Sequence, residues 1–288
     1  MSVYREPVFT YLVRRFFDLA AKALVPGARK VLPAYPRYAV IPGDYLGVSI
    51  IGNGIYERRE IELLKSVFAA KRLHDTVFLD IGGNLGNHSV ALAGSFAEVV
   101  AFEPNPPMVS LFRTNMLLSG SANVRLHEVG LGREDAELSF GLIEDGNDGS
   151  GSFVSGKGGK TLPVRKGDRF IAAHEPDLAS GAKRIGFVKC DVESFEAEVF
   201  GGLRMTLSQH KPLVTFESNR KAAGEEAWAE LRAAGYDTLH VLRETGDDSS
   251  KIIQEVKRLA GGYTAWLETR PSIPDRRCNL VASVGRID

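Results

Sequence analysis

The stretch that decides the fold runs from Thr76 to Glu103 and reads TVFLDIGGNLGNHSVALAGSFAEVVAFE. Its first part, residues 77–81, is apolar except for Asp80, which is typical of a strand buried on both faces. Three glycines follow in the turn, and a short helical pattern begins at Asn87, a good N-cap residue. A second apolar strand at 99–102 then ends on Glu103. This order of strand, glycine turn, helix and strand predicts an α/β fold with parallel strands.

The glycine turn and the acid after the second strand predict a nucleoside-binding pocket. Glycine lets the backbone approach a ligand closely because it has no Cβ, and a helix N-terminus presents free N–H groups. Glu103 lies 21 residues after Gly82, a spacing at which an acid accepts hydrogen bonds from ribose hydroxyls. The residues expected to hold the cofactor are therefore Asp80, Gly82, Gly83, Asn84, Gly86 and Glu103.

The spacing within the turn argues against a dinucleotide. A dinucleotide site needs G-x-G-x-x-G, whereas this chain has D-x-G-G-N-x-G, with Asp80 close to where a pyrophosphate would lie. The Y-x-x-x-K pair of many dehydrogenases does not occur either. An acid at this position suits a cationic ligand, such as the amino group or the sulfonium of S-adenosylmethionine.

Three segments of the chain resemble the FkbM family of S-adenosylmethionine-dependent methyltransferases. They are DIGGNLGNHSVALA…VVAFEPNPP…LFRTN, the piece G-I-Y-E at 54–57, and V-K-C-D-V-E-S-F-E at 188–196. The resemblance covers roughly residues 40–220, and the last piece makes it much more specific than the turn alone. One departure is Ser194, where the family usually has glycine. The resemblance implies a Rossmann-type class I methyltransferase fold, with S-adenosylmethionine as the cofactor and a hydroxyl of a sugar or other small molecule or glycan as the acceptor.

Acidic residues follow the fourth and fifth core strands, at the edge of the sheet where ligands bind in open α/β folds. Methyl transfer to a hydroxyl requires an aligned acceptor and removal of its proton. We therefore expect Asp191 and Glu193 to bind the acceptor and remove the proton. Lys189, two residues before Asp191, is expected to hold that acid ionised or to orient the acceptor.

Further residues are expected around this centre. Glu128, after the third strand, is placed where the fold holds an adenine edge. The family resemblance puts Tyr56 and Glu57 over the pocket, although Glu57 also suits the first turn of a helix. The remaining acceptor-binding candidates are Glu196 and Glu217; the alternative for Glu193 and Glu196 is that both are simply first-turn helix acids.

The sequence does not decide whether the site binds a metal ion. Asp191, Glu217 and Asn219 resemble the Mg²⁺ site of catechol-type methyltransferases, and oxygen ligands of this kind suit Mg²⁺. The spacing is only loosely met, so a metal-free site is the preferred hypothesis.

Composition excludes several other classes of protein. The 288 residues contain 36 Lys and Arg against 36 Asp and Glu, so there is no bulk charge to attract nucleic acid. An N-P-P-M sequence at 105–108 is interpreted as helix capping rather than as a DNA-methylation motif. The two cysteines, Cys190 and Cys278, are far apart, which disfavours a disulfide framework or a zinc site and fits a reducing cytoplasm.

The rest of the chain divides into an extension at 1–56 and a methyltransferase domain at 57–288, with an insertion at 246–277. Residues 8–25 predict an amphipathic helix too charged to span a membrane. This helix packs on the core, lies on a membrane or binds a partner, for example a second copy. The glycine-rich stretch at 144–160 is either a lid or a hairpin tip.

The sequence as a whole predicts a mostly parallel, seven-stranded sheet with helices on both faces and a helical extension before it. A further strand is expected at 137–143. The last two strands, at 236–242 and 279–284, are expected to pair antiparallel, because no crossover helix of the usual length joins them. The function expected is O-methylation of a small-molecule hydroxyl. Two alternatives are a nucleotide-dependent oxidoreductase and a non-catalytic module that binds adenosylmethionine.

Overall fold

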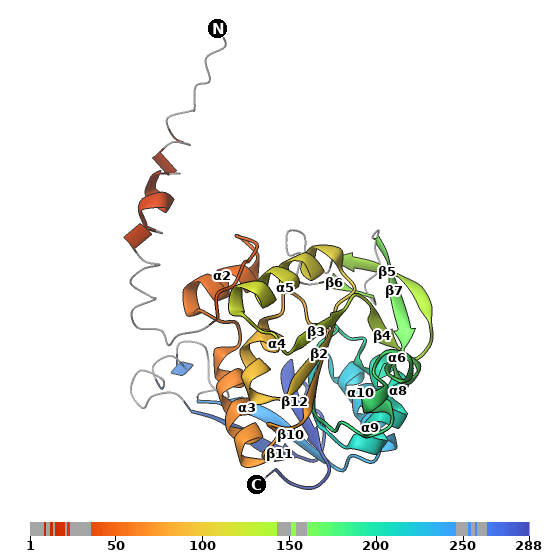
Figure 1. Cartoon of the computed structure of the whole chain (residues 1–288). Coiled ribbons are helices and arrows are strands. Elements are labelled where there is room, and N and C mark those ends of the chain that lie inside the picture. The colour runs from red at the N-terminus through yellow and green to blue at the C-terminus, as the bar shows by residue number, and fades with distance from the viewer. Residues whose placement is uncertain are drawn as a thin grey trace.

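The computed structural model describes residues 36–142, 151–153, 160–245 and 264–287, together with most positions between 9 and 23 and with 253, 254 and 257. Its centre is an eight-stranded sheet in the order β11-β10-β12-β9-β8-β1-β2-β3 (Figure 1). The five strands from β9 to β3 are parallel, and β12, β10 and β11 continue the sheet antiparallel. The parallel part and the antiparallel end agree with the sequence-based prediction.

The strands of this sheet are short and mostly buried. Their bounds are β1 Val77–Ile81, β2 Glu98–Phe102, β3 Val124–His127, β8 Ile185–Cys190, β9 Leu213–Ser218, β10 Thr238–Glu244, β11 Ala265–Arg270 and β12 Cys278–Ser283. The eighth strand, β11, lies within the segment that was predicted to be an insertion. The strand predicted near 137–143 belongs instead to a second sheet, in the order β4-β7-β5-β6. That sheet consists of β4 Gly130–Gly132, β5 Ala136–Leu142, β6 Gly151–Ser152 and β7 Lys160–Lys166.

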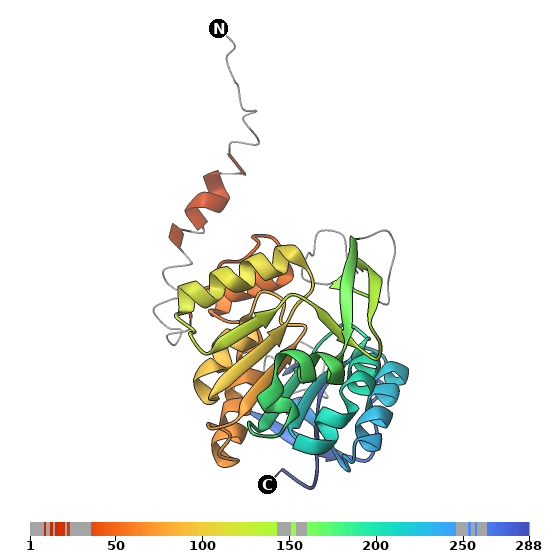
Figure 2. The same cartoon turned by 45° about the vertical axis from the view of Figure 1, so that its right-hand side comes forward.

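Helices cover both faces of the main sheet (Figures 1 and 2). On one face lie α3 Arg58–Ala70, α4 Asn87–Leu92 and α5 Pro106–Ser119, and on the other α6 Gly167–His174, α8 Glu196–Gly202, α9 Arg204–His210 and α10 Lys221–Ala233. Two short elements, η1 Ala93–Ser95 and α7 Pro176–Ala179, complete the connections, and α2 Tyr45–Asn53 lies beside α5.

The side chains of β1 point alternately to the two faces of the sheet, so this strand contributes to the hydrophobic core on each face. Leu79 and its neighbours two residues away pack with the helices on the α8–α10 side, whereas Phe78 packs with Phe68 of α3 and Phe187 of β8. Because successive side chains of a strand point to opposite faces, Asp80 shares the face of Phe78. In the same way, Lys189 shares the face of Phe187, and Asp80 and Lys189 are register partners.

The described positions between 9 and 23 are helical, as the sequence predicts. Their large apolar side chains are exposed rather than packed on the core, and both views draw this helix apart from the two sheets (Figures 1 and 2). Across the described residues, none of the helices combines the length and the apolar character that crossing a membrane requires.

Candidate active site

The glycine turn after β1 is shaped by close contacts with two neighbouring elements. Gly82, Asn84 and Gly86 have positive φ, at 80°, 52° and 87°. A Cβ on Gly82 would lie 2.0 Å from the carbonyl oxygen of Asp191, and one on Gly83 would lie 2.7 Å from the ring of Phe112 in α5. The turn therefore needs glycine both for its backbone conformation and because β8 and α5 leave no room for a side chain.

Glu103 is buried at the end of β2 and binds the glycine turn directly. Its Oε2 accepts the backbone N–H of Asn84 at 2.9 Å, and its Oε1 accepts that of Asn105 at 2.8 Å. Burial raises the pKa of Glu103 to about 7, against the opposing effect of these two hydrogen bonds. The carboxylate thus already lies where two loops meet, with its side chain almost excluded from solvent.

Asp80, Lys189 and Asp191 form a charged row between β1 and β8. Lys189 Nζ donates to Asp191 Oδ2 at 3.1 Å, and Ser89 Oγ donates to Asp80 Oδ2 at 2.6 Å. The other oxygen of Asp80 is buried and has no hydrogen-bond partner among the described residues. Burial disfavours the charge on Lys189, but the neighbouring Asp191 and Asp80 outweigh it, so its pKa is raised. For Asp191, Lys189 outweighs the effect of burial and lowers the pKa.

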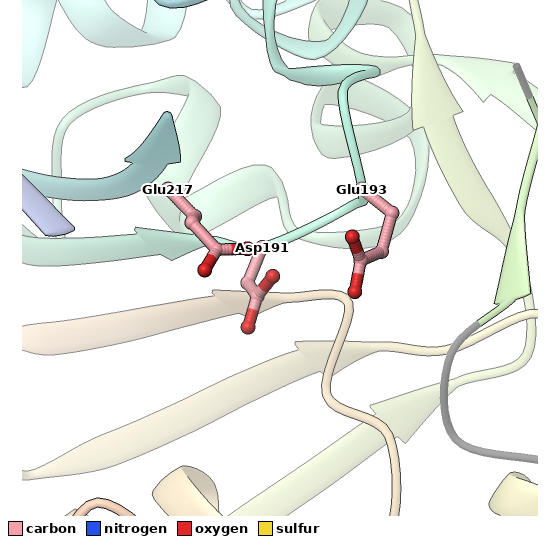
Figure 3. Close-up of side chains that lie close together, drawn as sticks. All are labelled: Asp191, Glu193 and Glu217. Carbon is pink, nitrogen blue, oxygen red and sulfur yellow. The ribbon is translucent and has the colours of Figure 1, made fainter. Parts of the chain in front are cut away.

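Three acids converge beside this row, from the ends of β8 and β9 (Figure 3). Asp191, Glu193 and Glu217 each place one carboxylate oxygen within 4.8 Å of the others. Asn219 Nδ2 donates to Glu193 at 2.9 Å, and Arg277 Nε donates to Glu217 at 2.5 Å. Burial and the nearby Asp191 raise the pKa of Glu193, and the same two causes raise that of Glu217 to about 7.

The backbone between β8 and α8 is strained. Glu193 and Ser194 both have positive φ, at 52° and 73°, a conformation that costs energy for residues with a Cβ. The Glu196 carboxylate accepts the N–H groups of Val192 at 3.2 Å and Ser194 at 3.3 Å, which stabilises this turn. Burial raises the pKa of Glu196 to about 8.

The turn, Glu103, Asp191 and Glu193 line one cleft of about 760 Å³, a volume that includes space open to solvent. Of the predicted residues, those that line it are Tyr56, Gly82, Gly83, Asn84, Glu103, Lys189, Asp191 and Glu193. A smaller cavity of about 230 Å³ shares Lys189 and Asp191 with it and is also lined by Glu57 and Glu217.

The remaining predicted residues lie around the cleft without lining it. Asp80 lies in β1 just before the turn, and Gly86 ends the turn as the N-cap residue of α4. Glu196 holds the strained turn described above. Glu128 is on the surface, where it forms an ion pair with Arg113, and it does not line the cleft.

The G-I-Y-E piece reaches the cleft through Asn87. The Asn87 side chain accepts the N–H of Tyr56 at 3.1 Å and donates to the Tyr56 carbonyl at 3.1 Å. Glu57 occupies the N-cap position of α3 with φ 50° and lies 3.3 Å from His88 Nε2. Glu57 therefore lies at the start of α3 and also lines the smaller cavity.

Several residues of the site were not foreseen from the sequence. Phe140 and Phe153 line the cleft from the hairpin of β5 and β6, with their rings 5.2 Å apart, and most of the predicted 144–160 lid lies outside the described residues. Glu60 is buried in the smaller cavity with a pKa of about 8, raised by burial, and accepts a hydrogen bond from Asn279. Only Glu60 had a sequence signal, since it lies one helical turn after Glu57.

Comparisons with known proteins find one family and one relative that are similar to this chain in sequence. Residues 80–238 match the family described as "Methyltransferase FkbM domain". "Methyltransferase 1" of Beauveria bassiana is 28% identical over an alignment of 162 residues. The match covers 50% of this chain and 65% of that protein, so it spans less than two thirds of the relative.

Among solved structures, a methyltransferase FkbM from Methylobacillus flagellatus has a TM-score of 0.46 at 14% identity, covering 72% of this chain and 43% of its own. A precorrin-6y C5,15-methyltransferase from Geobacter metallireducens has a TM-score of 0.45 at 12% identity, covering 86% of this chain and 93% of its own.

Proposed function

The chain belongs to the FkbM methyltransferase family, and from this premise we propose that it transfers a methyl group from S-adenosylmethionine to a hydroxyl of a sugar or another small molecule. Its fold is the Rossmann-type class I methyltransferase fold. The observation that supports the proposal most directly is that the glycine turn, Glu103 and the acids after β8 line the same cleft.

The donor side of the cleft fits adenosylmethionine. Gly82, Gly83 and Asn84 line the cleft, and Glu103 provides a buried carboxylate for ribose hydroxyls. In β1, just before the turn, Asp80 has a carboxylate oxygen without a partner among the described residues, which adds negative potential near a cationic ligand. Bound there, adenosylmethionine would supply an electrophilic methyl group for in-line transfer to the acceptor.

The acceptor side is assigned to Asp191 and Glu193, with Lys189 in support. Lys189 keeps Asp191 ionised, so that Asp191 accepts a hydrogen bond from the acceptor hydroxyl and orients it. Glu193 has a raised pKa, which makes it the better proton acceptor of the two near neutral pH. Tyr56 lines the same cleft and is proposed to contact the acceptor, with Glu57 and Glu217 at the margin.

A divalent cation is the alternative occupant of the acid cluster. Three carboxylate oxygens within 4.8 Å of one another are suitable ligands for Mg²⁺. In the described structure, each acid already accepts a hydrogen bond from a side chain: Asp191 from Lys189, Glu193 from Asn219 and Glu217 from Arg277. We therefore propose that these groups, rather than a metal, hold the acids in place. Titration with Mg²⁺ and Mn²⁺ in the presence of S-adenosylhomocysteine tests this: saturable binding abolished by Asp191→Asn would favour the metal.

The test of the cofactor is calorimetric titration with S-adenosylhomocysteine, with NAD and NADP as parallel controls. It requires no knowledge of the acceptor. Micromolar binding of S-adenosylhomocysteine alone supports the proposal. Binding of NAD or NADP alone would instead indicate an oxidoreductase. Binding without methyl transfer to any hydroxyl acceptor would favour a non-catalytic module.

A further inference from the structure

The helix between residues 9 and 23 exposes an apolar face that packs on no other described element. The large apolar side chains on it are Phe9, Leu12, Phe16, Phe17 and Leu19, with exposed fractions of 79, 58, 67, 65 and 55%. At about 100° per residue, they fall on one side of the helix, and Arg15, Asp18 and Lys22 fall on the other. Soluble proteins rarely leave so continuous an apolar surface in water without a binding role for it.

Charge sets this part of the chain apart as well. Residues 1–37 contain seven Lys and Arg against two Asp and Glu, whereas residues 38–288 contain 29 against 34. The neutral total therefore conceals a basic segment attached to an acidic remainder. Arg15 and Lys22 both pair with Asp18 on the polar face of the helix and remain largely exposed.

Helix α2 carries a second exposed apolar row, and this row adjoins the cleft. Tyr45, Val48 and Ile51 are 71, 57 and 43% exposed. The Tyr45 ring makes an edge contact with Tyr56, their centroids 6.1 Å apart, and Leu46 of the same helix lines the cleft with Tyr56. A surface that binds the outer face of α2 would thus lie beside the cleft.

We propose that the described helical residues between 9 and 23, together with the outer face of α2, form a docking surface for bilayers with anionic headgroups. An apolar face flanked by basic residues suits this environment, because the apolar side chains enter the acyl boundary while the cations meet lipid phosphates. A second copy of the chain would satisfy the apolar face but would bring two basic segments together, which charge repulsion opposes. An amphipathic helix with one apolar and one charged face would lie in the interface plane of the bilayer.

The experiment is co-sedimentation of the full chain with vesicles of equal parts phosphatidylcholine and phosphatidylglycerol, and with vesicles of phosphatidylcholine alone. The double variant Phe16→Ser/Phe17→Ser should bind the anionic vesicles about tenfold or more weakly, because it lacks the two aromatic rings that the bilayer would bury. Arg15→Gln/Lys22→Gln should weaken binding about tenfold through lost charge. Met205→Ser, which removes a 74% exposed apolar side chain on α9, is the matched control and should bind as the wild type does.

The possible outcomes distinguish a bilayer from a second copy of the chain as the partner of this surface. Binding to the anionic vesicles alone, weakened by salt and by both double variants, supports the docking surface. Absence of vesicle binding overturns it, and a concentration-dependent dimer that the Phe16/Phe17 variant dissolves would assign the face to a second copy. Equal binding of all variants, or equal binding to the neutral vesicles, also overturns the proposal. Unchanged affinity of each variant for S-adenosylhomocysteine would show that its fold and cleft are intact.

Discussion

At the scale of single residues, Glu103 connects the cofactor side of the cleft to the fold. Both of its oxygens already accept backbone N–H groups, from Asn84 and Asn105, so ribose hydroxyls must use the remaining lone pairs. A carboxylate has enough acceptor capacity for both sets of bonds, and a primary amide does not.

Glu103→Gln should therefore weaken S-adenosylhomocysteine binding about tenfold or more, because charge-assisted bonds are lost and an N–H group replaces an acceptor. Calorimetry measures the change. Glu128→Gln is the control and should leave the affinity unchanged, since Glu128 lies outside the cleft in an ion pair with Arg113. Wild-type affinity in Glu103→Gln would contradict the ribose assignment.

Glu193 is the residue on which proton removal is proposed to depend. Glu193→Gln keeps the oxygen that accepts from Asn219 and removes the basicity, so turnover should fall about a hundredfold with little change in S-adenosylhomocysteine affinity. A labelled-methyl assay with sugar acceptors measures turnover. The control is Glu198→Gln, a partly exposed acid of α8 that pairs with Arg133. If Glu193→Gln were as active as Glu198→Gln, another acid would have to be the base.

Ser194 occupies a position whose conformation favours glycine, which agrees with the departure from the family pattern seen in the sequence. Because its φ is 73°, Ser194→Gly should raise the free energy of unfolding by about 1 kcal/mol. Chemical denaturation measures this. Ser208→Gly, within α9, is the matched control and should be destabilising by about 0.5–1 kcal/mol. A loss of stability in Ser194→Gly would mean that the turn is not strained as described.

At the scale of elements, the turn between β1 and α4 joins the two halves of the cleft. Gly82 brings it against the Asp191 carbonyl, and Gly83 and Gly86 bring it against Phe112. The turn therefore positions its backbone relative to the acids after β8, and a change at Gly82 should affect both sides of the cleft.

Gly82→Ala should lower the free energy of unfolding by about 2 kcal/mol or more, because the new Cβ combines a positive φ with a clash against backbone. It should also abolish S-adenosylhomocysteine binding. Gly94→Ala, where nothing lies within 4 Å of the added Cβ, should change stability by less than about 1 kcal/mol. Thermal unfolding with and without the ligand compares them, and similar curves for the two variants would rule out the close approach.

At the scale of the whole molecule, the buried glutamates determine how stability depends on pH. Burial raises the pKa of Glu60 and Glu196 to about 8, and of Glu103 and Glu217 to about 7. Between the unfolded pKa near 4.5 and these values, the folded state binds more protons than the unfolded state, so stability falls as the pH rises.

The ligand-free protein should therefore have its highest melting temperature near pH 5, and it should melt several degrees lower near pH 8, at constant ionic strength. The lowered pKa of Asp191 acts in the opposite direction, but only at more acidic pH, below about 4. Calorimetric scans across this range provide the measurement. A melting temperature that rises steadily from pH 5 to pH 8 would show that ionisation of these glutamates does not destabilise the folded state.

The sequence by itself determined the parallel strands, the glycine turn and the meeting of Glu103 with Asp191 and Glu193 at one edge of the sheet. These follow from local patterns, because alternation and burial define a strand and parallel strands place their carboxyl ends on one side. The antiparallel end of the sheet was also predictable, although β11 was not, since its residues alternate only weakly between buried and exposed.

Only the tertiary structure decided which side chains complete the site. Glu60 meets Asn279 across 219 residues, and Arg277 meets Glu217 across 60, contacts that no local pattern encodes. Tertiary packing likewise paired Glu128 with Arg113 outside the cleft lining and used Glu196 to hold a strained turn. It also left the helix between 9 and 23 without a core to cover, because periodicity reveals that a face is apolar but not what will bury it.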